Sequence, residues 1–181
     1  MSDILGRIRE EQDVFQKLLG KLPGFSGYFD RENRRSADKL LRENVANRYE
    51  EQWRRISGVQ RDLISQGGLA FVDDMEAASI KLRQFIDRVR TAAYGYAGFF
   101  DAVKIRSEEL EQLHQYDLWL LSLVDEIGRA IDNVEASIGT DGLPAAIRHL
   151  TRLAQESVEA FEKRKEAILS GSSSQGTSQG V

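Results

Sequence analysis

The sequence has no cysteine and only 2 prolines among its 181 residues. The absence of cysteine excludes disulfide bonds, thiolate metal sites and thiol nucleophiles. No apolar run is long enough to span a bilayer, and the N-terminal stretch lacks the apolar core of a signal peptide. We therefore expect a cytoplasmic protein.

The chain also lacks a large excess of positive or negative charge. The chain carries 25 Lys and Arg against 29 Asp and Glu, for a net charge of −4. A dedicated nucleic-acid binder would carry a basic excess, so we expect no nucleic-acid partner. The hydrophobic content of 41% and charged content of 30% are typical of a helical protein with a charged surface. We expect one domain over residues 1–170.

Apolar residues recur at helical spacing through nearly the whole chain, without the alternation typical of β-strands. The spacing predicts a first helix that ends at Pro23, a second from about residue 31 to residue 65, and a third from about residue 72 to residue 93. Gly67 and Gly68 are expected to end the second helix. A turn at 139–142 precedes a further helix over 143–169, and residues 171–181 are expected to form a disordered Gly/Ser/Gln tail.

The fourth helical segment has the clearest periodicity. Its apolar residues follow alternating steps of three and four, which predicts a heptad seam and a long helix packed along its length. The seam residues are Leu110, Leu113, Asp117, Leu120, Val124, Ile127, Ile131, Val134 and Ile138.

Two seven-residue stretches, GFSGYFD at 24–30 and GYAGFFD at 95–101, are nearly the same and lie 71 residues apart. The same shift places Tyr49 on Leu120 and Trp53 on Val124. We interpret this as an internal duplication with pseudo-repeats 1–71 and 72–142. Two helix–corner–helix units predict an all-α fold, an elongated antiparallel four-helix bundle with approximate two-fold symmetry, and the segment 143–169 adds a fifth helix.

The runs LPGFSGYFDRENRRSADKLLRE and GYAGFFDAVKIRSEELEQLHQYDLWLL resemble a family of small uncharacterised prokaryotic helical proteins. In that family a PG-aromatic-x-GY stretch precedes a Glu-x-Arg-Arg-x-x-Asp helix start. The resemblance covers roughly residues 18–135 and implies a helical fold in which the two stretches correspond. The family has no established activity, so the resemblance implies no function.

The two glycine–aromatic stretches have more than one interpretation. Glycines allow a tight helix–helix corner, aspartates cap the helix that follows, and the aromatic side chains then plug the ends of the bundle. Alternatively, the second stretch continues one helix, or the aromatic side chains are exposed and dock a partner. The residues of the predicted corners are Gly24, Gly27, Asp30, Gly95, Gly98 and Asp101.

The start of the second helix is the best candidate for a binding surface. Its cations are spaced by 4, 4 and 3 residues, so they share one face beside three aromatic residues. Four cations at about 1 kcal/mol each give only about millimolar affinity for an anionic surface. The alternative is a solvated face of paired charges. The candidate surface consists of Phe25, Tyr28, Phe29, Arg31, Arg35, Lys39 and Arg42.

Asp117 interrupts the apolar seam of the fourth helix. Burying it without a partner would cost several kcal/mol, so we expect a partner from Arg83, Arg48 or Tyr49. The favoured interpretation is a polar residue that fixes helix register. The alternative is a carboxylate in a small pocket, poised for proton transfer.

A metal site is not expected. Glu111 and His114 form one Glu-x-x-His motif, whereas a di-iron bundle needs two. The other histidine, His149, has Ala146 three residues before it. No nucleophile lies near either histidine at a readable spacing, so we expect no enzyme and no cofactor. The sequence favours a non-catalytic interaction or scaffold protein with a protein partner or self-association. The alternative is a peripheral binder of anionic membranes or phosphate surfaces.

Overall fold

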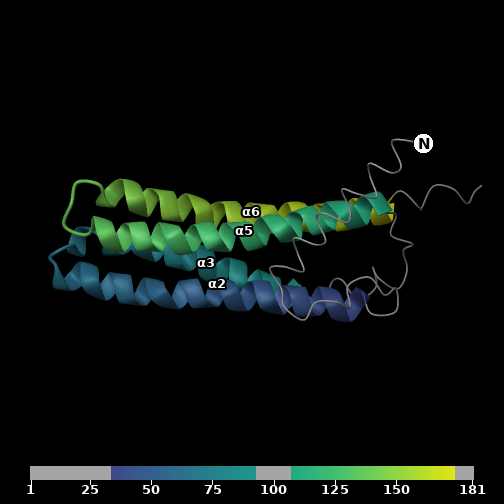
Figure 1. Cartoon of the computed structure of the whole chain (residues 1–181), viewed down its shortest axis with the longest axis horizontal. Coiled ribbons are helices and arrows are strands. Elements are labelled where there is room, and N and C mark those ends of the chain that lie inside the picture. The colour runs from purple at the N-terminus through teal and green to yellow at the C-terminus, as the bar shows by residue number, and fades with distance from the viewer. Residues whose placement is uncertain (1–33, 93–106, 174–181) are drawn as a thin grey trace, which may run out of the picture.

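A computed structural model describes the backbone of residues 34–92 and 107–173 and the side chains of residues 41–92 and 115–166. Within these ranges the chain is all helical, which confirms the predicted class. Four long helices lie side by side and form a rod (Figure 1). They are α2 (Arg34–Ser65), α3 (Val72–Thr91), α5 (Ser107–Ser137) and α6 (Leu143–Ser173), and a 3-10 helix η1 (Leu69–Phe71) joins the first two.

The helix bounds agree with the sequence pattern to within a few residues. The third helix was expected to reach residue 93 and ends at Thr91, and α6 continues past residue 169 to Ser173. The predicted helix before Pro23 and residues 174–181 lie outside the described residues. The place of α6 as a fifth helix therefore stays a prediction.

Glycines end two of the helices. Gly67 follows α2 with φ of 80° and Gly139 follows α5 with φ of 79°. These angles lie in the left-handed region, which a residue with a Cβ enters only at a cost of about 1–2 kcal/mol. The Gly68 amide also donates to the Leu63 carbonyl at 2.7 Å, closing the last turn of α2. The predicted helix end at Gly67 and Gly68 and the predicted turn at 139–142 are thus present.

The four helices form two hairpins, a first one (α2, η1 and α3) and a second one (α5 and α6). Helix α2 packs against α3 and α5, and α6 packs against α3 and α5. Contacts between α2 and α5 join residues 71 to 77 apart, and contacts between α3 and α6 join residues 74 apart. A constant separation means that each of these pairs runs parallel. The two hairpins therefore lie face to face with their tips at the same end (Figure 1).

This arrangement has a topological consequence. Because α2 neighbours α3 and α5 while α6 neighbours the same two helices, α3 and α5 occupy diagonal corners of the rod. Ala92 and Ser107 therefore lie at the ends of helices on opposite corners of the rod. The separation of about 71 residues between α2 and α5 follows from the length of one hairpin plus its connection. It is not evidence for duplication, which stays a prediction.

The interior is apolar along most of the rod. The predicted seam of the fourth helix is buried at every described position from Asp117 to Val134, and Ile138 is half-buried. Aromatic rings join three helices, since Tyr49 lies 4.2 Å from Phe85 between ring centroids and Phe85 lies 6.0 Å from Phe161. Leu110 and Leu113 lie outside the described side chains. Each buried leucine or isoleucine contributes about 1.5–3 kcal/mol to this packing.

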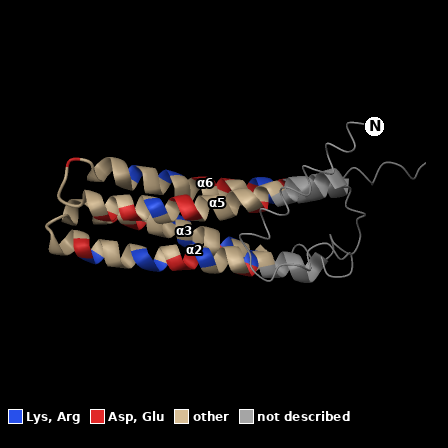
Figure 2. Cartoon of the chain, viewed as in Figure 1, with Lys and Arg blue, Asp and Glu red and all other residues tan. Residues whose placement is uncertain are grey.

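No helix within residues 34–92 and 107–173 combines the length and apolar character needed to cross a membrane. The described helices are instead amphipathic, with charged residues of both signs along each of them (Figure 2).

Candidate functional site

The buried ion pair in the second hairpin is the first candidate site. Asp117 on α5 is 2% exposed, as the seam pattern predicts, and Arg164 on α6 is 1% exposed. The Arg164 Nε donates to Asp117 Oδ1 at 2.6 Å, and its Nη2 donates to Oδ2 at 3.5 Å. The guanidinium thus meets both carboxylate oxygens, which is the geometry that such pairs favour.

The expected partners of Asp117 were wrong. Arg48 pairs instead with Asp125 at 2.5 Å, and Arg83 pairs with Asp87 on its own helix at 3.3 Å. These arginines are on outward-facing parts of α2 and α3, whereas Arg164 approaches from α6, the antiparallel neighbour of α5.

Tyr49 forms a second buried polar contact. Its hydroxyl donates to the Leu120 carbonyl at 3.1 Å and lies 3.0 Å from the Ser157 hydroxyl, which itself bonds the Leu153 carbonyl at 3.0 Å. Burial raises the pKa of Tyr49 far above its usual value of about 10, and the hydrogen bond with Ser157 only partly offsets this. The hydroxyl therefore stays protonated and joins α2, α5 and α6.

These contacts argue against the pocket interpretation of Asp117. Arg164 donates to both oxygens of this carboxylate inside the core, so a substrate would have to displace the guanidinium to reach them. The two buried contacts are neighbours along the rod, since Asp117 lies about one turn before Leu120 on α5 and Arg164 lies about two turns after Ser157 on α6. Together they form a buried polar layer in the core, made by Tyr49, Asp117, Ser157 and Arg164. This layer fits the predicted role in helix register.

The predicted basic stripe needs one correction. Arg42 is only 8% exposed and does not belong to a solvent-facing surface. It lies three residues before Val45 and seven before Tyr49, so helical spacing turns it toward the core. Arg35 and Lys39 lie in α2, but their side chains are not among those described. Phe25, Tyr28, Phe29 and Arg31 lie outside the described residues.

The predicted corner residues also lie outside the described part of the chain. They are Gly24, Gly27, Asp30, Gly95, Gly98 and Asp101. The helices that follow the two stretches begin at Arg34 and Ser107, and these helices are parallel neighbours. The starts of α2 and α5 therefore lie at the same end of the rod.

No metal site is apparent in the described part of the chain, where no three His, Cys, Asp or Glu side chains cluster suitably. His149 is exposed, and its Nδ1 lies 3.0 Å from an Arg152 nitrogen. The side chains of Glu111 and His114 are not among those described.

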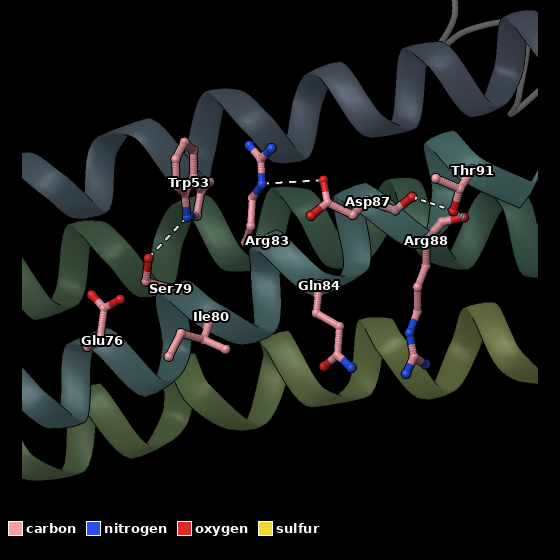
Figure 3. A pocket seen from close by; sticks show the side chains of 9 residues that line it. All are labelled: Trp53, Glu76, Ser79, Ile80, Arg83, Gln84, Asp87, Arg88 and Thr91. Atoms are coloured by element: carbon pink, nitrogen blue, oxygen red, sulfur yellow. Dashed lines mark hydrogen bonds and ion pairs between the residues drawn. The ribbon is translucent and has the colours of Figure 1, made fainter.

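An open hollow on the outer side of the first hairpin is the second candidate site. It has a volume of about 490 Å³ and is lined by Trp53 of α2 and by one side of α3 from Glu76 to Thr91 (Figure 3). The Trp53 indole N–H donates to the Ser79 hydroxyl at 3.0 Å, and the Arg83 guanidinium lies 5.2 Å from the ring centroid. Ile80 is 58% exposed beside them. We call this surface the α3 groove.

The sequence reasoning missed the α3 groove. It placed Trp53 on the buried Val124 as an apolar match, but the tryptophan is half-buried and its ring edge faces α3. Ile80 gave a usable signal, because it is a large apolar residue off the stripe formed by Met75, Leu82 and Ile86.

Comparisons of the chain with protein families, with curated proteins and with solved structures find no match.

Proposed function

We propose that this chain is a non-catalytic helical interaction or scaffold protein that acts in the cytoplasm through its helix faces. Its predicted architecture, a bundle of duplicated units with a fifth helix, and its place in the prokaryotic helical family are part of this proposal. The described residues support a non-catalytic role because the one candidate acid, Asp117, is paired with Arg164 within the core.

The α3 groove is the observation that carries the proposal. Its α3 side extends over the 15 residue steps from Glu76 to Thr91, which is about 22 Å at 1.5 Å per residue. A groove of that length, open to solvent and with the apolar side chains of Ile80 and Trp53 in its Glu76 half, suits an amphipathic helix better than a compact ligand. Arg83, Asp87 and Arg88 place both signs of charge beside it, as is usual at the rim of a protein contact.

We propose self-association as the contact that the α3 groove makes. The test is sedimentation of the full chain at concentrations up to about 1 mM, where a contact of about 4 kcal/mol becomes populated. We expect the average mass to rise with concentration, and Ile80→Glu to suppress the rise because a carboxylate would have to be desolvated in the contact.

Ile64→Glu is the matched control. Ile64 is 50% exposed but lies near the hairpin tip and outside the α3 groove, so its replacement should leave the mass curve unchanged. A wild-type chain that stays monomeric throughout, or an equal response to both substitutions, would show that the groove is not the contact.

Peripheral binding to anionic membranes or phosphate surfaces gains no support from the described residues. With Arg42 buried, the stripe retains Arg31, Arg35 and Lys39. Three cations at about 1 kcal/mol each correspond to binding weaker than millimolar. Co-sedimentation with anionic liposomes at physiological salt is therefore expected to leave the chain in the supernatant.

A further inference from the structure

The ion pairs between the two hairpins have one sign on each side. Among the described side chains, four ion pairs join the hairpins, and each places its cation on the first hairpin and its anion on the second. Arg48 pairs with Asp125 at 2.5 Å, and Arg88 pairs with Glu162 at 2.8 Å. Arg55 pairs with Asp132 and also lies 3.8 Å from Glu135.

The two hairpins also differ in total charge. Residues 34–92 contain 12 Lys and Arg against 9 Asp and Glu, for a net charge of +3. Residues 107–173 contain 6 Lys and Arg against 13 Asp and Glu, for a net charge of −7. Charged residues of both signs occur along every helix (Figure 2), so the difference in net charge is seen only when all residues of a hairpin are counted. Each hairpin is thus electrostatically complementary to the other and repels its own kind.

The surface between the hairpins is apolar as well as charged. The inward faces of α2 and α3 bury Ile56, Val59, Leu82 and Ile86, and those of α5 and α6 bury a similar set. A hairpin separated from its partner would expose this face to water, which strongly favours finding a complementary hairpin.

A single connection joins the two hairpins. Between Ala92 and Ser107 there are 15 residue steps, which can span about 50 Å when fully extended. The diagonal of a four-helix rod is only about 14 Å, from interaxial distances of 8–10 Å. The covalent chain is therefore long enough to let the second hairpin leave its own first hairpin and reach that of a neighbouring molecule.

We propose that the surface between the hairpins is exchangeable and that its partner is a second copy of this chain. In the exchanged dimer, residues 34–92 of each copy pack on residues 107–173 of the other, with the same ion pairs and the same apolar core. This contact goes beyond the proposed self-association through the α3 groove, because it uses the inner faces of the hairpins and not the outer face of α3.

Concentration decides which form is populated. A tethered hairpin has an effective concentration on the order of millimolar, so the closed monomer dominates in dilute solution. Exchange takes over when the pairing within one chain is weakened while the pairing between chains is retained. The one-sided charge pattern allows these two pairings to be separated by mutation.

The experiment uses two full-length variants with opposite charge reversals. The first carries Arg48→Glu and Arg55→Glu, and the second carries Asp125→Arg and Asp132→Arg. Within each variant, like charges face each other across the α2–α5 contact. In an exchanged dimer of one copy of each, every reversed hairpin meets its complement. The two variants are unfolded together in urea, refolded as an equimolar mixture, and analysed by light scattering and thermal melting.

We expect the mixture to form a dimer of twice the 20.5 kDa chain mass that melts several degrees above either variant alone. Raising the salt to about 1 M, where the screening length is about 3 Å, should reduce the dimer fraction because the ion pairs are half-exposed. The control chain carries all four substitutions, restores complementarity within itself, and should be a monomer that melts near the wild type.

A mixture that stays monomeric, with each component melting as it does alone, overturns the proposal. If the two variants do not fold separately, the mixture still tests the proposal. Folding regained only on mixing supports exchange, and no folding on mixing while the fourfold variant folds overturns it. Neither result depends on Ile80, so failure of hairpin exchange and failure of the α3 groove are separate outcomes.

Discussion

Two ion pairs in this molecule use the same chemical groups in opposite surroundings. Asp117 and Arg164 are 2% and 1% exposed inside the second hairpin. Arg55 and Asp132 are 35% and 64% exposed where α2 meets α5. Removing two charges from water costs several kcal/mol per ion. The buried pair is therefore stable only if the two groups make good hydrogen bonds with each other. The exposed pair stays hydrated, and its contribution is about 0–1 kcal/mol.

Contact distance alone therefore does not rank the contributions of these ion pairs to stability. Both pairs are close, but only the buried pair leaves an unsolvated charge behind when one member is removed. The pairs between the hairpins are better suited to selecting which surfaces meet than to holding them together.

Replacing Asp117 with alanine should have the largest effect. The Arg164 guanidinium would stay buried without the carboxylate against which it lies, and such removals cost about 3–5 kcal/mol. We expect a correspondingly lower urea midpoint at an unchanged slope, measured by circular dichroism. The double variant Asp117→Leu with Arg164→Met should recover most of the loss, because it removes both charges at similar volume. A single substitution that costs less than about 1 kcal/mol would contradict the assignment of the pair as buried.

Tyr49→Phe should have an intermediate effect. It removes a hydroxyl that bonds Leu120 and Ser157, which costs about 1–2 kcal/mol near neutral pH. The pKa of Tyr49 is raised in the folded state, so its protonated form is stabilised there. That contribution is complete below the unfolded value of about 10 and is lost as the pH rises above it.

The pH dependence separates this tyrosine from the others. Above about pH 10 the free energy of unfolding of the wild type should fall by about 1.4 kcal/mol per pH unit relative to that of Tyr49→Phe. Urea unfolding of both proteins at about pH 8 and pH 11 measures the difference. Parallel loss of stability in the two proteins would show that the Tyr49 hydroxyl is not the buried group that titrates.

Arg48→Ala should have the smallest effect. Arg48 and Asp125 are 31% and 37% exposed, so the pair contributes about 0.2–1 kcal/mol and less at high salt. Thermal melting at low salt and at about 1 M salt should show the gap between wild type and variant closing as the pair is screened. A loss as large as that of Asp117→Ala would contradict the distinction between the two kinds of pair.

Much of the fold could be predicted because it depends on local periodicity. The alternation of three and four residues gave the seam from Asp117 to Val134, and the glycines at 67 and 139 gave the helix ends. The burial of Asp117 followed from the same periodicity, since a residue on the seam faces the core whatever its polarity.

The sequence contains a pattern that points to the partner of Asp117. Ser157 and Arg164 continue the steps of three and four through Leu150, Ala154 and Phe161 on α6. They are polar exceptions on an apolar stripe, as Asp117 is on α5, and Arg42 is a similar exception on α2. Polar residues at core positions of different helices are candidates to meet one another. Which of them meet depends on helix order, and that order is not encoded in any single stripe.

Local sequence patterns define the helices, their apolar faces and the points where they end, because these features follow from contacts a few residues apart. The packing of the helices in three dimensions decides that α2 lies beside α5 and α3 beside α6, that Arg164 meets Asp117, and that Trp53 lines the α3 groove. Those outcomes depend on which amphipathic faces pack together. Amphipathic helices can in general pack in more than one arrangement, and side-chain charge and shape select among them.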